Sequence, residues 1–158
     1  MLHKKTRINF LNSIVIGKLN YLLPLLSNCS PKAHNKLHKI VMTAARTAIG
    51  SYCFKQSVSK ILRQSNFLNI DQMIKVSCLK FIHSLTINKI PESTCKLLKF
   101  PKRQSAEIKL INCPENKLTR TFHLYYGLKY YNKLPNRLKD LSITNFKVQI
   151  RQYILDNG

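Results

Sequence analysis

The segment from residue 30 to residue 50 carries the signals that start, sustain and end an α-helix. Ser30 is suited to the N-cap, where its hydroxyl accepts a hydrogen bond from the first turn, and Pro31 then occupies the first helical position, where no N–H is needed. Between them and Gly50, apolar side chains recur three and four residues apart, at Leu37, Val41, Ala44 and Ala48. Gly50 readily adopts the left-handed conformation that ends helices. The sequence therefore predicts a helix over 31–49.

Similar periodicity covers most of the chain, and we expect an all-α fold, an irregular bundle of about five to six helices with one basic loop. Further helices are predicted over 6–28, 57–64, 69–88, 119–134 and 142–156, with a turn or two over 91–98. Pro24 should kink the first of these or end it early, whereas Asn69 or Asp71 should cap the helix that ends at residue 88. Residues 100–118 lack the pattern and contain turn formers, with a brief strand near 108–111. The charge of this loop comes from Lys102, Arg103 and Lys109.

The same spacing indicates which side chains should face the core. The first helix should bury Ile8, Leu11, Val15, Leu19, Leu22 and Leu26. The helices that follow residue 56 should bury Val58, Ile61, Leu62, Ile70, Ile74, Cys78, Phe81, Ile82, Leu85, Phe146, Ile150, Tyr153 and Ile154. His83 has no His, Asp or Glu four residues away with which to bind a metal, so we expect it to pack in the core or lie at the surface.

A chain of 158 residues is long enough to bury a core without disulfides, so we expect one helical domain over 1–158. Its core should span 6–99, followed by the loop over 100–118 and by aromatic and basic helices over 119–156. The five cysteines form no C-x-x-C pair, and we expect reduced thiols in an intracellular protein, nuclear or cytoplasmic, without a signal peptide. Polar residues interrupt the apolar run over 8–26, which favours a buried helix over a membrane span.

The balance of charge points to a polyanionic partner. Lys and Arg number 27 against six Asp and Glu, giving a net charge of +21, and no acid precedes Asp71. A molecule this cationic repels itself unless counterions or a polyanion surround it, so nucleic acid is the first partner to consider. Lys, Asn, Ile, Tyr and Phe all have A/T-rich codons, and a base-biased genome would raise them together. Such a bias gives no reason for the absence of acids over seventy residues.

Two groups of residues are candidates for contact with nucleic acid. Lys32, Lys36, Lys39 and Arg46 lie opposite the apolar stripe of helix 31–49 and span about 20 Å at 1.5 Å per residue, enough to follow several phosphates. A solvated helix face is the other interpretation, although such faces normally mix both signs of charge. In the aromatic block, Tyr125, Tyr126, Tyr130 and Tyr131 alternate with Lys129 and Lys133. These tyrosines either stack on bases or form core with their hydroxyls at the surface.

The residues needed for nucleotidyl transfer are missing. Two-metal catalysis requires carboxylates brought together around the ions, but Asp71, Asp140 and Asp156 are isolated and no aromatic-x-Asp-Asp turn occurs. The four glycines form no phosphate-binding loop. We therefore expect no enzymatic activity on this chain, no cofactor, no metal site and no small-molecule substrate.

One stretch near the end of the chain is more specific. Gly127 is followed by Tyr131-Asn132, by Leu134-Pro135 and, about ten residues later, by Phe146-Lys147. This spacing resembles the carboxyl-terminal end of reverse transcriptases encoded by non-LTR (LINE-like) retrotransposons. Tyr131 stands where many members of that family have tryptophan. The likeness extends more loosely from Phe10 to Leu155.

The resemblance implies a thumb and helical extension downstream of the catalytic palm, which grips template RNA, cDNA or target DNA by its backbone. The residues that it assigns to phosphate contacts are Lys32, Lys36, Lys39, Arg46, Lys129, Lys133, Arg137, Lys147 and Arg151. The chain would then be a fragment of a larger polyprotein whose upstream polymerase domain is a possible partner, and whose parent family is RNA-directed DNA polymerase. The alternatives are an independent basic RNA- or DNA-binding protein and an interaction module that docks its first helix on a missing amino-terminal domain.

Overall fold

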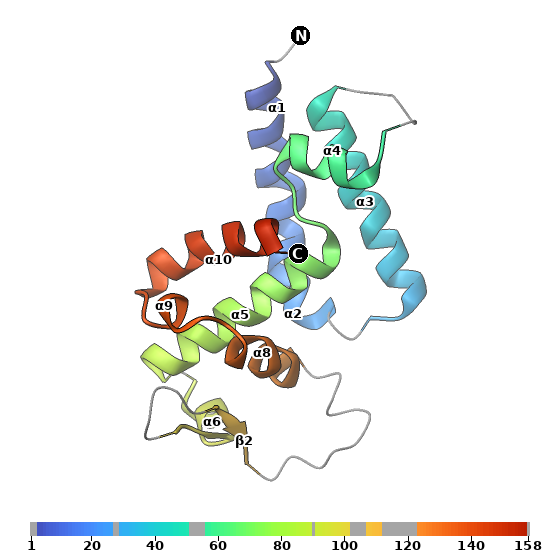
Figure 1. Cartoon of the computed structure of the whole chain (residues 1–158). Helices are drawn as coiled ribbons and strands as arrows, with labels where there is room; N and C mark the ends of the chain where they lie inside the picture. Colours follow the sequence, from blue (N-terminus) through green and yellow to red (C-terminus); the bar gives the residue numbers. More distant parts are fainter. Residues whose placement is uncertain are drawn as a thin grey trace. The chain divides into compact units, whose positions relative to one another are not determined.

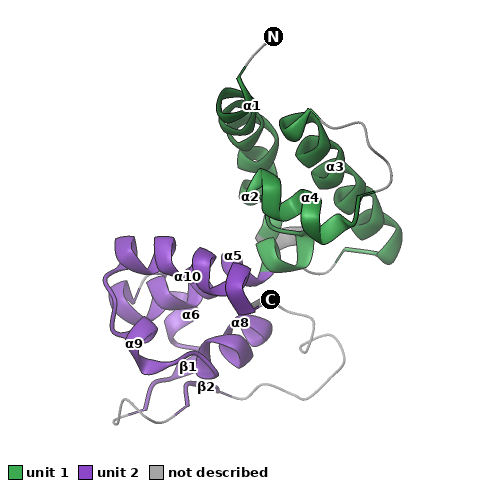
Figure 2. Cartoon of the chain, turned by 45° about the horizontal axis from the view of Figure 1, so that its top comes forward, with its two compact units in different colours: residues 1–74 green, residues 75–158 purple. Residues whose placement is uncertain are grey.

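The computed structural model of the chain is mostly helical, which confirms the all-α prediction (Figure 1). It describes residues 3–26, 29–50, 56–89, 91–101, 107–111 and 123–157, with the backbone alone at 24–26 and 123. The chain divides into two compact units, residues 1–74 and 75–158, which we call unit 1 and unit 2 (Figure 2). The division falls inside helix α5, Ile70–Asn88, whereas the expected single domain with its core over 6–99 had no boundary there.

Unit 1 begins with one continuous helical rod made of three parts. Helix α1, Lys4–Leu11, leads into a π-helical turn η1, Asn12–Ile16, and then into α2, Gly17–Leu26. Pro24 does not end the helix early, since α2 runs on to Leu26.

The π turn changes which side of the rod is buried. The buried residues are Ile16, Leu19 and Leu23, whereas Leu22, predicted to face inward, is exposed, and Ile8, Leu11 and Val15 are half-buried. A π turn holds more residues than an α turn, so the side chains that follow it are rotated relative to a regular helix. The predicted stripe assumed one uniform period, which is why Leu22 was misplaced and Leu23 missed.

Helix α3, Pro31–Ile49, has the ends that the sequence predicted. The Ala33 N–H donates to the Ser30 hydroxyl at 3.3 Å, and Gly50 adopts the left-handed conformation with φ of 74°. A third contact was not foreseen: the Arg7 guanidinium donates to the Ile49 carbonyl at 3.3 Å. A cation at this end of a helix also interacts favourably with the helix dipole. Arg7 thereby ties α1 to the end of α3.

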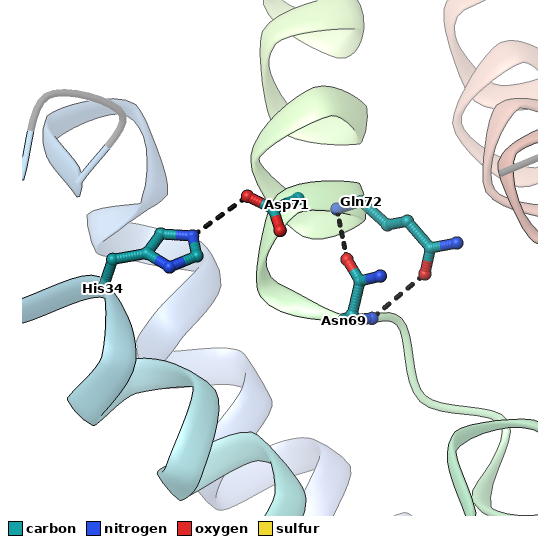
Figure 3. Close-up of polar contacts among 4 residues, drawn as sticks. All are labelled: His34, Asn69, Asp71 and Gln72. Carbon is teal, nitrogen blue, oxygen red and sulfur yellow. Dashed lines mark hydrogen bonds and ion pairs between the residues drawn. The ribbon is translucent and has the colours of Figure 1, made fainter. Parts of the chain in front are cut away.

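The rest of unit 1 covers the inner face of α3. Helix α4, Val58–Ser65, packs on α3 and buries Ile61 and Leu62, but Val58 is exposed. Asn69 then caps α5 through a reciprocal pair of bonds with Gln72: the Gln72 N–H donates to the Asn69 side chain at 2.8 Å, and the Asn69 N–H donates to the Gln72 side chain at 3.0 Å (Figure 3). Of the two predicted caps, Asn69 is therefore the one used.

Asp71 makes a different contact. Its carboxylate lies 2.9 Å from Nε2 of His34 on α3 (Figure 3). This contact joins the first turn of α5 to the amino-terminal half of α3, so the earliest acid in the sequence is used inside unit 1.

Unit 2 contains the remainder of α5 and the elements that follow it. These are α6, Glu92–Cys95; β1, Leu98–Lys99; β2, Lys109–Leu110; α8, His123–Asn132; α9, Asn136–Lys139; and α10, Ile143–Asn157. The expected strand near 108–111 is present as β2, which pairs with β1 in antiparallel register, Leu98 opposite Leu110. The predicted helical turn over 91–98 is present as α6, which ends at Cys95; Lys96 and Leu97 form a turn, and β1 begins at Leu98. Sequence reasoning missed α9, which begins directly after Pro135.

Some expectations lie outside what the structure describes. They are the burial of Leu26 and the end of the first helix at 28, the basic residues Lys102 and Arg103 of the loop over 100–118, and the start of the aromatic helix at 119 or 121.

The core of unit 2 is mainly apolar and comes from α5, α8, α9, α10, β1 and the turn between α8 and α9. Its buried side chains include Val76, Cys78, Leu79, Ile82, Leu85, Leu98, Leu124, Leu128, Leu134, Leu138, Phe146, Ile150 and Ile154. Burial raises the pKa of the Cys78 thiol to about 11, so this cysteine is an unreactive core residue, as expected. Among the described residues, no helix combines the length and apolar character needed to cross a membrane.

Gly127 allows α8 to approach α5 closely. A Cβ atom at this position would lie 2.7 Å from Cγ1 of Ile82 and 3.3 Å from the Cys78 carbonyl oxygen. Gly127→Ala should therefore lower the free energy of unfolding by about 1–3 kcal/mol, since a packed core does not accept the added methyl group. Urea denaturation followed by circular dichroism measures this change.

Gly17→Ala is the matched control for that measurement. A Cβ atom at Gly17 would meet only the Asn12 carbonyl oxygen at 3.7 Å, so Gly17→Ala should raise the free energy of unfolding by about 0.5–1 kcal/mol through helix propensity. Equal effects of the two substitutions would contradict the close approach of α8 to α5.

Candidate nucleic-acid interface

The solvent side of α3 carries three of the four cations predicted there. Lys32, Lys36 and Lys39 are exposed, on the side opposite the buried Val41 and Ala48. They span about 10 Å at 1.5 Å per residue. Neither of the ion pairs His34–Asp71 and Lys96–Glu92 uses any of them. The three lysines form an extended cationic line on unit 1.

Arg46 does not belong to that line. Its side chain is half-buried, and it lies four residues after Met42, which is buried. Residues four apart are neighbours on a helix surface, so Arg46 sits at the margin between the buried and exposed sides of α3. Arg46 is therefore less accessible than the three lysines, and its predicted phosphate contact stays a prediction.

The remaining predicted cations all lie in unit 2, on different elements. Lys129 is exposed on α8, Lys133 on the turn after it, Arg137 on α9 and Lys147 on α10, while Arg151 of α10 is half-buried. Arg137 borders a groove of about 330 Å³ between α9 and α10 that also contains the Asp156 carboxylate. Because Asp156 repels anions there, this groove is a poorer phosphate site than the other flank of α10.

On that other flank, three cations from two helices come together. Lys80 of α5 lies near both Lys147 and Arg151, which are four residues apart on α10. Burial lowers the pKa of Lys80, and the charges of Arg151 and Lys147 lower it further. We call Lys80, Lys147 and Arg151 the α5–α10 cluster. Sequence reasoning missed Lys80, although its position between the apolar residues Leu79 and Phe81 indicated a cation at the edge of the core.

The residues near the end of the chain that resemble a reverse-transcriptase motif pack inside unit 2, together with His83 of α5. His83 is fully buried, stacked on Phe146 with 3.8 Å between ring centroids. Its Nε2 lies 3.0 Å from the Leu141 carbonyl, which can only accept, so this nitrogen carries the proton; Nδ1 then accepts from the Tyr131 hydroxyl at 3.1 Å. His83, Tyr131 and Phe146 thus join α5, α8 and α10, and we call them the buried aromatic node.

The side chain of Asn132 makes two hydrogen bonds to the backbone of Ile108, as a neighbouring β-strand would. Its side-chain amide donates to the Ile108 carbonyl at 3.0 Å, and its side-chain oxygen accepts from the Ile108 N–H at 3.2 Å. Leu134 is buried, and Pro135 has the extended conformation of an N-cap at the start of α9. With the close approach at Gly127, each of these motif positions has a structural role in unit 2.

The tyrosines of α8 differ in how far they are buried. Tyr131 is buried in the aromatic node, as the core interpretation predicted. Tyr126 is 39% exposed, and Tyr125 and Tyr130 are half-buried. The core interpretation therefore holds for Tyr131 and fails for Tyr126.

Carboxylates are scattered through the described part of the chain. Asp71, Glu92, Asp140 and Asp156 lie on or beside α5, α6, α9 and α10 respectively. Among the described residues, no group of three or more His, Cys, Asp or Glu side chains is arranged to hold a metal ion.

Comparison with known proteins gives no relative from which a function can be transferred. No protein-family model, curated protein or solved structure matches the chain.

Because His83 is buried in the aromatic node, we expect the free energy of unfolding to depend on pH. Burial lowers the pKa of His83 below its usual value of 6.5, partly offset by the bond to Leu141. In the unfolded chain the His83 ring is protonated at its ordinary pKa of 6.5, whereas in the folded chain protonation requires a lower pH. The contribution of His83 to the free energy of unfolding should therefore be highest above pH 6.5 and fall as the pH decreases below that value. An NMR titration of the His83 ring protons should give a midpoint below 6.5, with urea denaturation at matching pH values.

His34→Gln is the control for this titration. It removes a histidine of unit 1 and leaves His83 in place, so the titration of His83 should not change. A His83 midpoint at or above 6.5 would contradict the buried, singly protonated state.

Proposed function

We propose that this chain grips the sugar–phosphate backbone of nucleic acid without catalysing a reaction on it. We further propose that it corresponds to the carboxyl-terminal thumb and helical extension of a non-LTR retrotransposon reverse transcriptase. The observation that carries the proposal is the α5–α10 cluster, in which Lys80 is held close to Lys147 and Arg151.

The energetics of the cluster favour an anionic ligand. The charged groups that act on Lys80 are both cations, and partial burial removes some of the water that would otherwise screen them. Bringing like charges together destabilises the free protein, and a phosphate bound among them relieves that repulsion. Binding also releases the counterions condensed on the nucleic acid, which adds to the affinity.

Lys32, Lys36 and Lys39 support the same function in unit 1. Their separation along α3 suits consecutive backbone charges, and no acid precedes Asp71 in the sequence. Each unit thus carries its own set of phosphate ligands. Contacts of this kind neutralise phosphate without reading bases, so affinity should depend strongly on salt and weakly on sequence.

An independent basic RNA- or DNA-binding protein would use the same residues. The two proposals differ in what precedes the chain in the genome. Upstream sequence encoding a palm with paired aspartates, intact or interrupted, favours the retroelement origin, and a separate gene with its own promoter favours the independent protein.

A docking module is a second candidate, which the exposed apolar residues of the first rod favour. Phe10, Ile14 and Tyr21 are all exposed there. A chain that aggregates alone and is solubilised by an added polymerase palm supports this candidate. A stable soluble monomer counts against it.

The triple substitution Lys80→Gln, Lys147→Gln and Arg151→Gln tests the phosphate contacts directly. It should weaken binding to duplex and hybrid oligonucleotides of every sequence alike. It should also reduce the slope of log K against log salt by about 3, since each lost phosphate contact removes about one unit. Fluorescence anisotropy titrations at several salt concentrations measure both quantities.

Lys96→Gln, Lys99→Gln and Lys109→Gln together form the matched control. These three exposed cations also lie in unit 2, so the control loses the same net charge from residues outside the α5–α10 cluster. Equal losses in the two triple variants would mean that net charge alone drives binding. A wild-type chain that does not bind at low salt would remove the proposal.

A further inference from the structure

Helix α8 presents two faces of different character. Leu124, Leu128 and Tyr131 are buried at positions i, i+4 and i+7. Tyr126, Lys129 and Tyr130 follow each other at i, i+3 and i+4, the spacing of a single helix face, and Lys133 lies in the turn directly after the end of α8. On this second face Tyr126 and both lysines are exposed and Tyr130 is half-buried. We call these four residues the α8 face.

The aromatic rings of this face are held by one another. Tyr126 and Tyr130 stack with 6.2 Å between centroids and 22° between planes, and Tyr125 meets Tyr126 edge-on at 6.4 Å. Lys75 of α5 places its ammonium 4.8 Å from the centre of the Tyr130 ring. This cation–π contact keeps a positive charge beside the rings. The face therefore combines rings of fixed orientation with cations on either side.

We propose that the α8 face binds unpaired bases of single-stranded nucleic acid, with the exposed Tyr126, supported by Tyr130, as the stacking ring and Lys75, Lys129 and Lys133 as its phosphate ligands. This inference rests on the proposed function and deepens it, because it names the form of nucleic acid that one surface of unit 2 takes.

Charge and ring exposure together favour this occupant over a duplex or an acidic protein. Bases in a duplex are stacked on each other and offer no free ring surface, whereas every unpaired base has one, and it adds to affinity when it stacks on an aromatic side chain. An acidic protein would be attracted by the lysines but would leave the exposed ring of Tyr126 without a matching partner. A single strand uses both features at once, since its phosphates alternate with its bases.

The test separates bases from phosphates. The full chain is titrated with a labelled deoxythymidine oligomer of about twelve nucleotides, within the usual site size of such proteins, and with an abasic oligomer of equal length that has the same phosphates. The wild-type chain should bind the base-bearing oligomer about tenfold more tightly. A parallel oligouridine titration distinguishes RNA from DNA as the preferred source of the bases.

Substitutions at Tyr126 assign the difference to this face. Tyr126→Ala should remove the preference for the base-bearing oligomer, while Tyr126→Phe, which keeps the ring, should retain it. Tyr21→Ala is the matched control, because Tyr21 is 86% exposed on α2 and lies outside the α8 face. It should leave both affinities unchanged. The Lys80, Lys147 and Arg151 triple variant should weaken both oligomers alike.

The possible results distinguish the two proposals. Equal binding of the two oligomers to the wild-type chain overturns the base platform and leaves backbone binding in place. A preference that survives Tyr126→Ala also overturns it, because the bases then bind elsewhere. Failure of both oligomers to bind at low salt overturns the proposed function itself.

Discussion

The stacking of His83 on Phe146 is the contact on which unit 2 depends. A histidine this deeply buried is stable only when both ring nitrogens have partners, and here Leu141 and Tyr131 supply them. The partners lie on or beside α8 and α10, so satisfying one side chain of α5 fixes the position of both helices. The cations Lys147 and Arg151 then lie beside Lys80 as a consequence of packing.

The same packing decides which side of α8 faces water. Gly127 allows close approach to α5, and Tyr131 is held by its hydroxyl. Because Gly127 and Tyr131 face the core, the helical period places Tyr126 and Tyr130 on a side of α8 that is at least partly exposed. Gly127, Tyr131 and Phe146 thus help to set which side chains of unit 2 remain exposed, although they are buried themselves.

Local signals allowed much of the fold to be predicted. The ends of α3 depend on Ser30 and Gly50 within the segment itself, so the sequence was sufficient. The π turn over Asn12–Ile16 has no such local marker, and the buried side of the first rod was misplaced. The cap provided by Arg7 depends on a contact between residues 42 positions apart in sequence, which periodicity does not reveal.

The candidate interface was predictable where a single helix defines it. Lys32, Lys36 and Lys39 follow from the period of α3 alone. The contact of Lys75 with Tyr130, and the influence of Lys147 and Arg151 on Lys80, arise only when α5 packs on α8 and α10. Arg46 is half-buried beside Met42. The position of a residue along a helix predicts the direction in which its side chain points, but the exposure of that side chain depends on the elements that pack beside it.

The most direct test of this account is an NMR titration of the isotope-labelled chain with a short single-stranded oligonucleotide. The account predicts chemical-shift changes at Lys80, Lys147 and Arg151 and at Tyr126 and Tyr130, while the signals of His83 and Phe146 stay in place. Changes confined to other surfaces, or loss of the His83 and Phe146 signals on binding, would contradict it.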